Sequence, residues 1–317
     1  ERTFRRKKDA EELSCGFEVN KNKLKGLAGT ANAQIVGYGQ WTDVVSVSSV
    51  GESLYNFYGF VCDGVYKDLE DLQTSPKPAK YPANGVFDRT NTVWVGDVKY
   101  KDISGPDGVP DGVIDDYDKT NIGSPMPKFT FGWTNTFRYK NFDLSVFING
   151  SYGNKVYNYL SMKLTHMNSP WTNQLNAVNG RAQLVPINPN KVYEDGTMWY
   201  NDVSNVMVAN PGASIPRATI NDPNDNDRIS DRYIEDGSYI RLKNISLGYT
   251  FPKKTIDKLG LSNLRIYANI QNLLTITGYD GYDPEIGAST SSVNVYGLDN
   301  GRYPSPTVYS FGLNVSF

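Results

Sequence analysis

Several stretches of the chain alternate between apolar and polar residues, which is the period of β-strands with one apolar face. The last of them, at residues 306–317, is the clearest. One side of this stretch is aromatic and aliphatic, and it carries Tyr309, Phe311, Leu313, Val315 and Phe317. The other side is mostly small and polar, and it carries Val308, Ser310, Gly312, Asn314 and Ser316. The pattern predicts a terminal strand that is apolar on one side only.

The same period recurs in four other stretches, at residues 128–139, 141–153, 239–251 and 263–277. Two weaker stretches, 14–25 and 52–62, are also expected to be strands. Only Lys140 and Asn141 separate two of the alternating stretches, so these two form a tight hairpin. We therefore predict an all-β fold with about seven antiparallel strands.

The connections between these strands alternate in length. Short links follow Tyr139 and Phe251, whereas long links rich in Pro, Gly, Asn and Asp cover residues 63–127, 154–238 and 278–304. Outer-membrane β-barrels have this arrangement, with short periplasmic turns and long extracellular loops. Charged residues on the polar side, such as Arg138, Asp143 and Arg265, suit a water-filled lumen better than a dry core.

These features predict the C-terminal segment of a large transmembrane β-barrel. Seven strands do not close a barrel of even strand number, so the chain is interpreted as part of a larger wall. The alternative is a soluble β-sandwich that binds carbohydrate or acts in adhesion, in which the apolar sides would form a core.

Composition excludes only a few classes of protein. Hydrophobic residues make up 39% of the chain, the mean hydropathy is -0.48 and the formal net charge is -2. These values argue against a nucleic-acid partner, and no uninterrupted apolar run is long enough for a membrane-spanning helix. The two cysteines, Cys15 and Cys62, allow one disulfide bridge or two free thiols.

Three blocks of sequence resemble the SusC/RagA-type TonB-dependent transporters of the Bacteroidetes outer membrane. They are VGESLYNFYGFVCDGVYK, GDVKYKDISGPDGVPDGVIDDYDKTNIGSPMPKFTFGWTNTFRYKNFDLSVFINGSYGNKVYN and SYIRLKNISLGYTFPKKTIDKLGLSNLRIYANIQNLLTITGYDGYDPE, followed by the closing FGLNVSF. The resemblance covers about Phe17 to Phe317. It implies a barrel of about 22 strands blocked by an N-terminal plug, of which residues 1–317 are roughly the last third.

The resemblance also implies a function and partners. Such transporters import glycan oligosaccharides or oligopeptides across the outer membrane, together with a SusD-like lipoprotein lid and with TonB acting through the plug. This chain would be no enzyme and would supply barrel wall and outer loops. The ending formed by Ser310, Gly312, Val315 and Phe317 resembles the recognition signal for barrel assembly. Counting strands back from it puts Glu1 on the outer side, in an exposed charged stretch.

The stretch DGVPDGVIDDYD has the rhythm of a calcium-binding loop. Its candidate ligands are Asp107, Asp111, the Val113 carbonyl, Asp115 and Asp118. Val109 at the third ligand position and Pro110 depart from the pattern, and a solvated acidic turn without metal is the alternative. A second acidic run, Asn221 to Asp231, has no glycine at the turn position and is interpreted as a loop.

Other candidate contacts lie in the long loops. His166 is the only histidine, so a histidine cluster for zinc is excluded and a loop-packing or solvent-facing role is expected. Aromatic and amide side chains suit sugar or peptide ligands, or a protein partner, and the alternative for each is loop packing. These candidates are Trp171, Asn173, Gln174, Trp199, Tyr200, Tyr279 and Tyr282.

Overall fold

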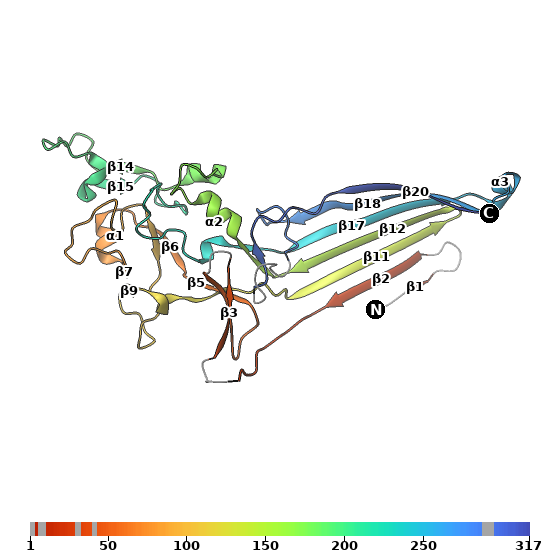
Figure 1. Ribbon diagram of the computed structural model, residues 1–317, viewed down its shortest axis with the longest axis horizontal. Coiled ribbons are helices and arrows are strands. Elements are labelled where there is room, and N and C mark those ends of the chain that lie inside the picture. The colour runs from red at the N-terminus through yellow and green to blue at the C-terminus, as the bar shows by residue number, and fades with distance from the viewer. Residues whose placement is uncertain (1–3, 6–10, 29–32, 40–42, 287–294) are drawn as a thin grey trace.

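A computed structural model of the chain describes residues 4–5, 11–28, 33–39, 43–286 and 295–317. It has two parts (Figure 1). A long slanted antiparallel sheet, here called the wall, carries the short turns at one end. At its other end lie the described residues between β2 and β11, between β12 and β17 and between β18 and β20, here called the loop assembly.

The wall is a seven-stranded sheet in the order β1-β2-β11-β12-β17-β18-β20, with every pair antiparallel. Its strands are β1 Phe4–Arg5, β2 Glu11–Glu18, β11 Phe129–Tyr139, β12 Phe142–Tyr152, β17 Tyr239–Thr250, β18 Asn263–Thr277 and β20 Val308–Ser316. The predicted all-β fold and the five clearly alternating strands are confirmed, each to within two residues. The sheet is open within this chain.

Two weaker strand predictions need correction. Of the predicted stretch 14–25, only residues 14–18 are in a strand, which is β2 at Glu11–Glu18. The stretch 52–62 contributes no strand to the wall. Instead, β5 Asn56–Gly59 lies in a separate sheet between β4 and β10. Alternation reports the local period of a strand and not its partners, so it could not distinguish the two sheets.

The seventh wall strand comes from the charged N-terminal stretch instead. Phe4 and Arg5 pair with Leu13 and Glu12 of β2, whereas the stretch was expected to be an exposed loop. Residues 1–3 and 6–10, including the expected position of Glu1, lie outside the described residues.

Cross-strand pairing gathers the apolar side chains on one face of the wall. Residues directly opposite one another share a face, so each row of partners runs across several strands. One row consists of Phe137, Leu144, Leu247, Ala268 and Phe311. The next residue along each strand gives a polar row of Thr136, Ser145, Ser246, Asn269 and Ser310. The apolar face is uncovered, with Phe311 85% and Leu247 48% exposed. The β-sandwich alternative requires these side chains to be in a core and is therefore wrong for this chain.

Two glycines leave room for large side chains on the polar face. Arg265 of β18 reaches over β17 to Asp143 of β12, with Nη2 2.6 Å from Oδ2. It passes over Gly248, where a Cβ atom would lie 2.3 Å from Arg265 Nη2. In the same way, the ring of Tyr267 lies over Gly312, where a Cβ atom would come within 2.1 Å of it.

The loop assembly contains short strands and helices. A four-stranded sheet has the order β10-β5-β4-β3, with β3 at Gln34–Tyr38, β4 at Val44–Ser49 and β10 at Thr120–Gly123. A three-stranded sheet places β13 Lys155–Asn158 between β16 Ile234–Asp236 and β19 Leu298–Asp299. The remaining strand pairs are β6 Cys62–Val65 with β8 Val98–Tyr100, β7 Lys77–Pro78 with β9 Val113–Ile114, and β14 Leu184–Pro186 with β15 Val206–Val208.

The helices are short. α1 Leu69–Thr74 and α2 Tyr159–Thr165 lie in the loop assembly, and α3 Lys253–Ile256 lies at the far end of the wall (Figure 1). The 3₁₀ turns are η1 Asp116–Asp118, η2 Asn176–Gly180, η3 Trp199–Asn201, η4 Val203–Asn205, η5 Asp231–Tyr233 and η6 Asp257–Leu259. In the described part of the chain, no helix has the length and hydropathy needed to cross a membrane.

The buried apolar residues of the loop assembly form three clusters. Trp94, Tyr157 and Tyr100 each belong to one of them, and Trp94 and Tyr157 are fully buried. The loops therefore have cores of their own, as a soluble domain does. Cys15 and Cys62 are free, so of the two possibilities for the cysteines the unpaired thiols are observed.

Candidate functional site

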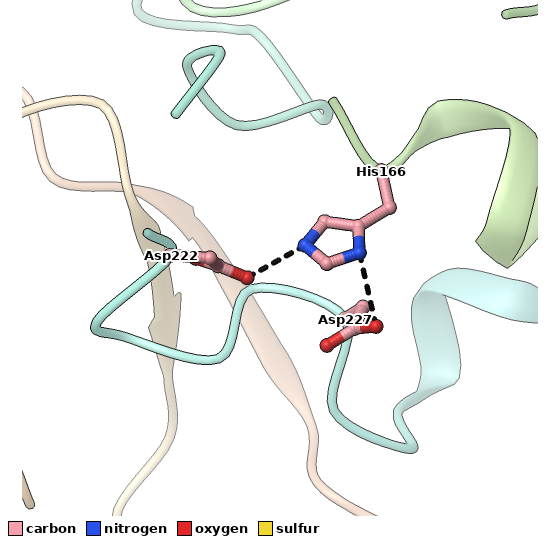
Figure 2. A group of neighbouring side chains, drawn as sticks. All are labelled: His166, Asp222 and Asp227. Carbon is pink, nitrogen blue, oxygen red and sulfur yellow. Dashed lines mark hydrogen bonds and ion pairs between the residues drawn. The ribbon is translucent and has the colours of Figure 1, made fainter. Parts of the chain in front are cut away.

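His166 lies at the C-terminal cap of α2 with a carboxylate at each ring nitrogen (Figure 2). Nε2 is 2.7 Å from Asp222 Oδ2, and Nδ1 is 3.0 Å from Asp227 Oδ2. Burial alone would lower the pKa of His166, but the hydrogen bonds and charges of Asp222 and Asp227 outweigh it and raise the pKa to about 9. His166 is therefore an imidazolium at neutral pH, and both of its nitrogens donate hydrogen bonds.

This geometry decides what the histidine can do chemically. His166, Asp222 and Asp227 are the one set of three potential metal ligands that comes together among the described residues. A zinc ion held tetrahedrally at about 2.1 Å by a ring nitrogen and a carboxylate oxygen would separate these two atoms by roughly 3.4 Å. The observed distances are those of hydrogen bonds, and the two carboxylates bind opposite ring nitrogens. An imidazolium is also no general base, so the group is a charged clamp between α2 and the 221–231 segment.

The clamp continues into a buried polar network. Asn226 donates from Nδ2 both to Asp222 Oδ1 and to Asp97 Oδ1. Arg217 binds both oxygens of Asp97, with Nε 2.7 Å from Oδ1 and Nη2 3.2 Å from Oδ2. Asp97 is fully buried and Arg217 is 4% exposed. Because Asp97 belongs to the first long loop and the other residues to the second, the network joins the two loops.

Backbone turns explain how the 221–231 segment reaches inward. Asp222 and Asp225 adopt left-handed backbone conformations, with φ of 38° and 50°, which aspartate tolerates better than most residues. Asn224 and Asn226 are then almost completely buried. The sequence interpretation as a plain loop missed this cluster, and the alternation of Asn and Asp at turn positions was the available signal.

The predicted calcium ligands do not converge. Asp118 is fully buried, and its carboxylate accepts hydrogen bonds from the backbone N–H groups of Ile103, Ser104 and Asp115. Asp115 and Asp111 accept from the N–H groups two residues further along, those of Tyr117 and Val113. Val113 lies in β9, and Asp107 joins no cluster of potential ligands among the described residues. The carboxylates thus stabilise turns and a helix cap, and the calcium site stays a prediction.

The predicted aromatic and amide contacts fall into different environments. Trp171 is 92% exposed beside exposed Asn173 and Gln174, and Tyr282 is 63% exposed. Two other aromatics are structural, since Trp199 packs on the cluster around Trp94 and the hydroxyl of buried Tyr279 donates to Asp299. Tyr200 lies beneath the guanidinium of Arg89, 4.9 Å from ring centroid to Cζ. The structure does not bring these residues together at one site.

The four residues of the expected assembly signal lie at the edge of the wall. β20 is the last strand in the sheet order, and Ser310 and Gly312 lie on its polar face. Val315 and Phe317 are on the apolar side and are exposed. Gly312 has a structural reason to be glycine, since Tyr267 occupies the space above it. The signalling role stays a prediction.

Comparison with known proteins relates the chain to transport proteins. No protein-family profile matches it. The chain is 32% identical over 272 residues to the TonB-dependent receptor P3 of Formosa agariphila, which covers 84% of the chain and 22% of the relative. It is 32% identical over 311 residues to the TonB-dependent receptor P26 of the same organism, covering 94% and 26%. It is 29% identical over 209 residues to the TonB-dependent receptor SusC of Bacteroides thetaiotaomicron, covering 65% and 17%.

A solved structure of the RagAB peptide transporter matches with a TM-score of 0.62 and 19% identity, over 99% of this chain and 28% of that one. This likeness supports the fold. The chain spans about a quarter or less of the length of the curated relatives named here.

Proposed function

We propose, from the premise that the chain belongs to the TonB-dependent receptors of the SusC and RagA type, that it forms part of an outer-membrane importer of oligomeric nutrients. It supplies barrel wall and outer loops. The observation that carries this proposal is the division of the wall into two faces. An exposed apolar row runs across β11, β12, β17, β18 and β20, and a polar row lies behind it.

In this function the apolar face meets lipid and the polar face lines the lumen. Alternating lipid-facing and lumen-facing residues are typical of transmembrane β-barrels. The ion pair between Arg265 and Asp143 lies on the polar face, where water can solvate it. All three long connections leave the same end of the wall, which is then the extracellular end (Figure 1).

The partners follow from the same premise. A SusD-like lipoprotein would cover the outer loops, and TonB would act through the plug domain. The exposed stretch that contains Trp171 is a suitable contact for such a lid, because aromatic side chains are enriched in protein interfaces. The imported material is a glycan oligosaccharide or an oligopeptide. One structural relative is described as a peptide transporter, and a SusC receptor is among the sequence relatives.

The test is fractionation followed by uptake. The complete transporter that contains this chain is expected in the outer-membrane fraction, and after detergent extraction it should co-purify with a lipoprotein. Uptake of labelled oligomers should stop when TonB is deleted. Recovery of the transporter in a soluble fraction, or uptake that does not depend on TonB, would contradict the proposed function.

A further inference from the structure

A cavity of about 580 Å³ opens inside the loop assembly, away from the wall. Segments from the first and second long loops, within 63–127 and 154–238, line it together with the start of β4. The apolar side chains of Ile114, Met162 and Ile229 are part of its lining and are here called its floor. Charged side chains of both signs stand around this floor. This volume falls in the range of pockets that hold small ligands.

Arg228 lines this cavity, and its guanidinium group binds no carboxylate. Its Cζ lies 5.3 Å from the ring centroid of Phe60 and 5.2 Å from that of Tyr100. Among the described residues, the side chain of Arg228 makes no hydrogen bond or ion pair. Arg217, Arg241 and Arg265 each bind a carboxylate. Two aromatic rings therefore hold the donors of Arg228 in place while leaving them free for an anion.

Some of the other charged side chains around the cavity already have an ion-pair or hydrogen-bond partner, and others do not. Lys119 binds Asp116 at 2.8 Å, and Asp227 is held by His166. Asp225 is exposed beside Arg228 and has no hydrogen bond to its carboxylate within the described part of the chain. The carboxylate of Asp43, which also lines the cavity, has no hydrogen bond among the described residues either. Arg228 and two carboxylates are thus available around the apolar side chains.

We propose that this cavity binds the carboxyl-terminal end of a short peptide. Arg228 would donate two parallel hydrogen bonds to the free carboxylate, in a bidentate arrangement. The apolar floor would contact a hydrophobic side chain of the peptide, and Asp225 would face its ammonium group. This inference rests on the proposed import function and names its substrate class. A neutral sugar would need a free aromatic face to stack on, and the face of Phe60 is covered by Arg228 and Lys119. The carboxylates on the rim also repel a polyanionic ligand.

Calorimetric titration of the complete detergent-purified transporter tests this proposal. The probes are trileucine, trileucine with an amidated carboxyl terminus, maltotriose and trigalacturonate. Trileucine should bind about tenfold or more tightly than its amide, because only the free acid offers a charged acceptor to Arg228. Arg228→Gln should remove this difference, and Arg228→Lys should restore part of it. Arg89→Gln is the matched control, since Arg89 also lies over a tyrosine ring but outside the cavity.

The wild-type comparison of acid and amide needs no variant to fold, so the proposal stays falsifiable if Arg228→Gln is unstable. Equal affinity for acid and amide would overturn it, and so would tighter binding of maltotriose or trigalacturonate. If one of these results is found in a transporter whose uptake of oligomers still depends on TonB, the peptide-binding proposal fails and the proposed function stands. Loss of TonB-dependent uptake altogether would instead count against the proposed function.

Discussion

The wall and the loop assembly bury opposite kinds of side chain, although they belong to one chain. In the wall, Phe311 is 85% and Leu313 61% exposed, and polar rows lie on the other face. In the loop assembly, Trp94 and Tyr157 are fully buried, and so is the charged Asp97. Every fully buried apolar side chain among the described residues lies outside the long wall strands. The wall thus exposes apolar side chains that the loop assembly buries, as the proposed function requires of a barrel wall in lipid with its loops in water.

The two parts are also held together differently. The wall depends on long backbone ladders, such as the pairing of β17 with β18 over residues 239–250 and 265–277. The loop assembly has short strands and depends on three apolar clusters and one buried polar network. A variant can therefore weaken one part and leave the other intact.

The largest effect is expected from Asp97→Asn. It leaves Arg217 buried without its partner charge, which costs about 3 to 5 kcal/mol. Limited proteolysis of the complete transporter should cut the long loops much faster, while the heat-resistant migration of the barrel in gels is unchanged. Asp143→Asn, which breaks the part-exposed pair with Arg265 in the wall, is the control and should leave the loops protected. Equal loop cleavage in both variants would show that the two parts are not separable.

Next in size is Phe311→Arg in the middle of β20. A charge on the lipid face of a barrel costs about 2 to 4 kcal/mol near the centre of the membrane. The amount of heat-resistant barrel in the outer membrane should fall. Ser310→Arg places the same charge on the polar face and is the matched control. If Ser310→Arg lowers the yield as much as Phe311→Arg, the assignment of the two faces is wrong.

The clamp at His166 predicts a pH dependence that is confined to the loops. The pKa of His166 is raised to about 9 from an ordinary 6.5, so its stabilisation is fully present below pH 6.5 and is lost as pH rises through about 9. Between pH 7 and pH 10 the loss amounts to about 2 kcal/mol. Protease resistance of the loops should fall over this range in the wild type. The fall should be smaller in His166→Gln, and an identical fall would contradict the charged clamp.

The smallest effect is expected from Gly312→Ala. The added methyl group would overlap the ring of Tyr267, and overpacking of this kind costs about 1 kcal/mol or somewhat more. The unfolding temperature of the detergent-solubilised barrel should decrease slightly. Gly278→Ala, with nothing within 4 Å of its added Cβ atom, is the control. A restored unfolding temperature in Gly312→Ala combined with Tyr267→Ala would confirm the overlap as the cause.

The sequence predicted the wall well because its strands are long and strictly alternating. β11, β12, β17, β18 and β20 carry 9 to 15 residues each, which is enough for a period of two to be recognised. The strands of the loop assembly have only 2 to 6 residues, so no period emerges. The apparent strand at 52–62 was assigned to the wrong sheet because alternation does not report which strands pair.

The candidate site was much less predictable. His166 and Asp222 are 56 residues apart in the chain, and only the folding of the second long loop brings them together. In the calcium-like stretch, the carboxylates have the sequence spacing of metal ligands. In the structure, carboxylates of this stretch accept hydrogen bonds from backbone N–H groups instead. The free donors of Arg228 are equally invisible in sequence, because they depend on Phe60 and Tyr100 from other segments.

The reach of Arg265 over Gly248 to Asp143 has a mechanical consequence. The bond joins two strands that are not neighbours, β12 and β18, across the intervening β17. If any of the three strands slid along its neighbour by a residue pair, the two charges would separate and a side chain other than glycine would enter the path. The bond therefore resists shear among three strands at once. Under the proposed import function, this resistance would help the wall to keep its register near its short-turn end.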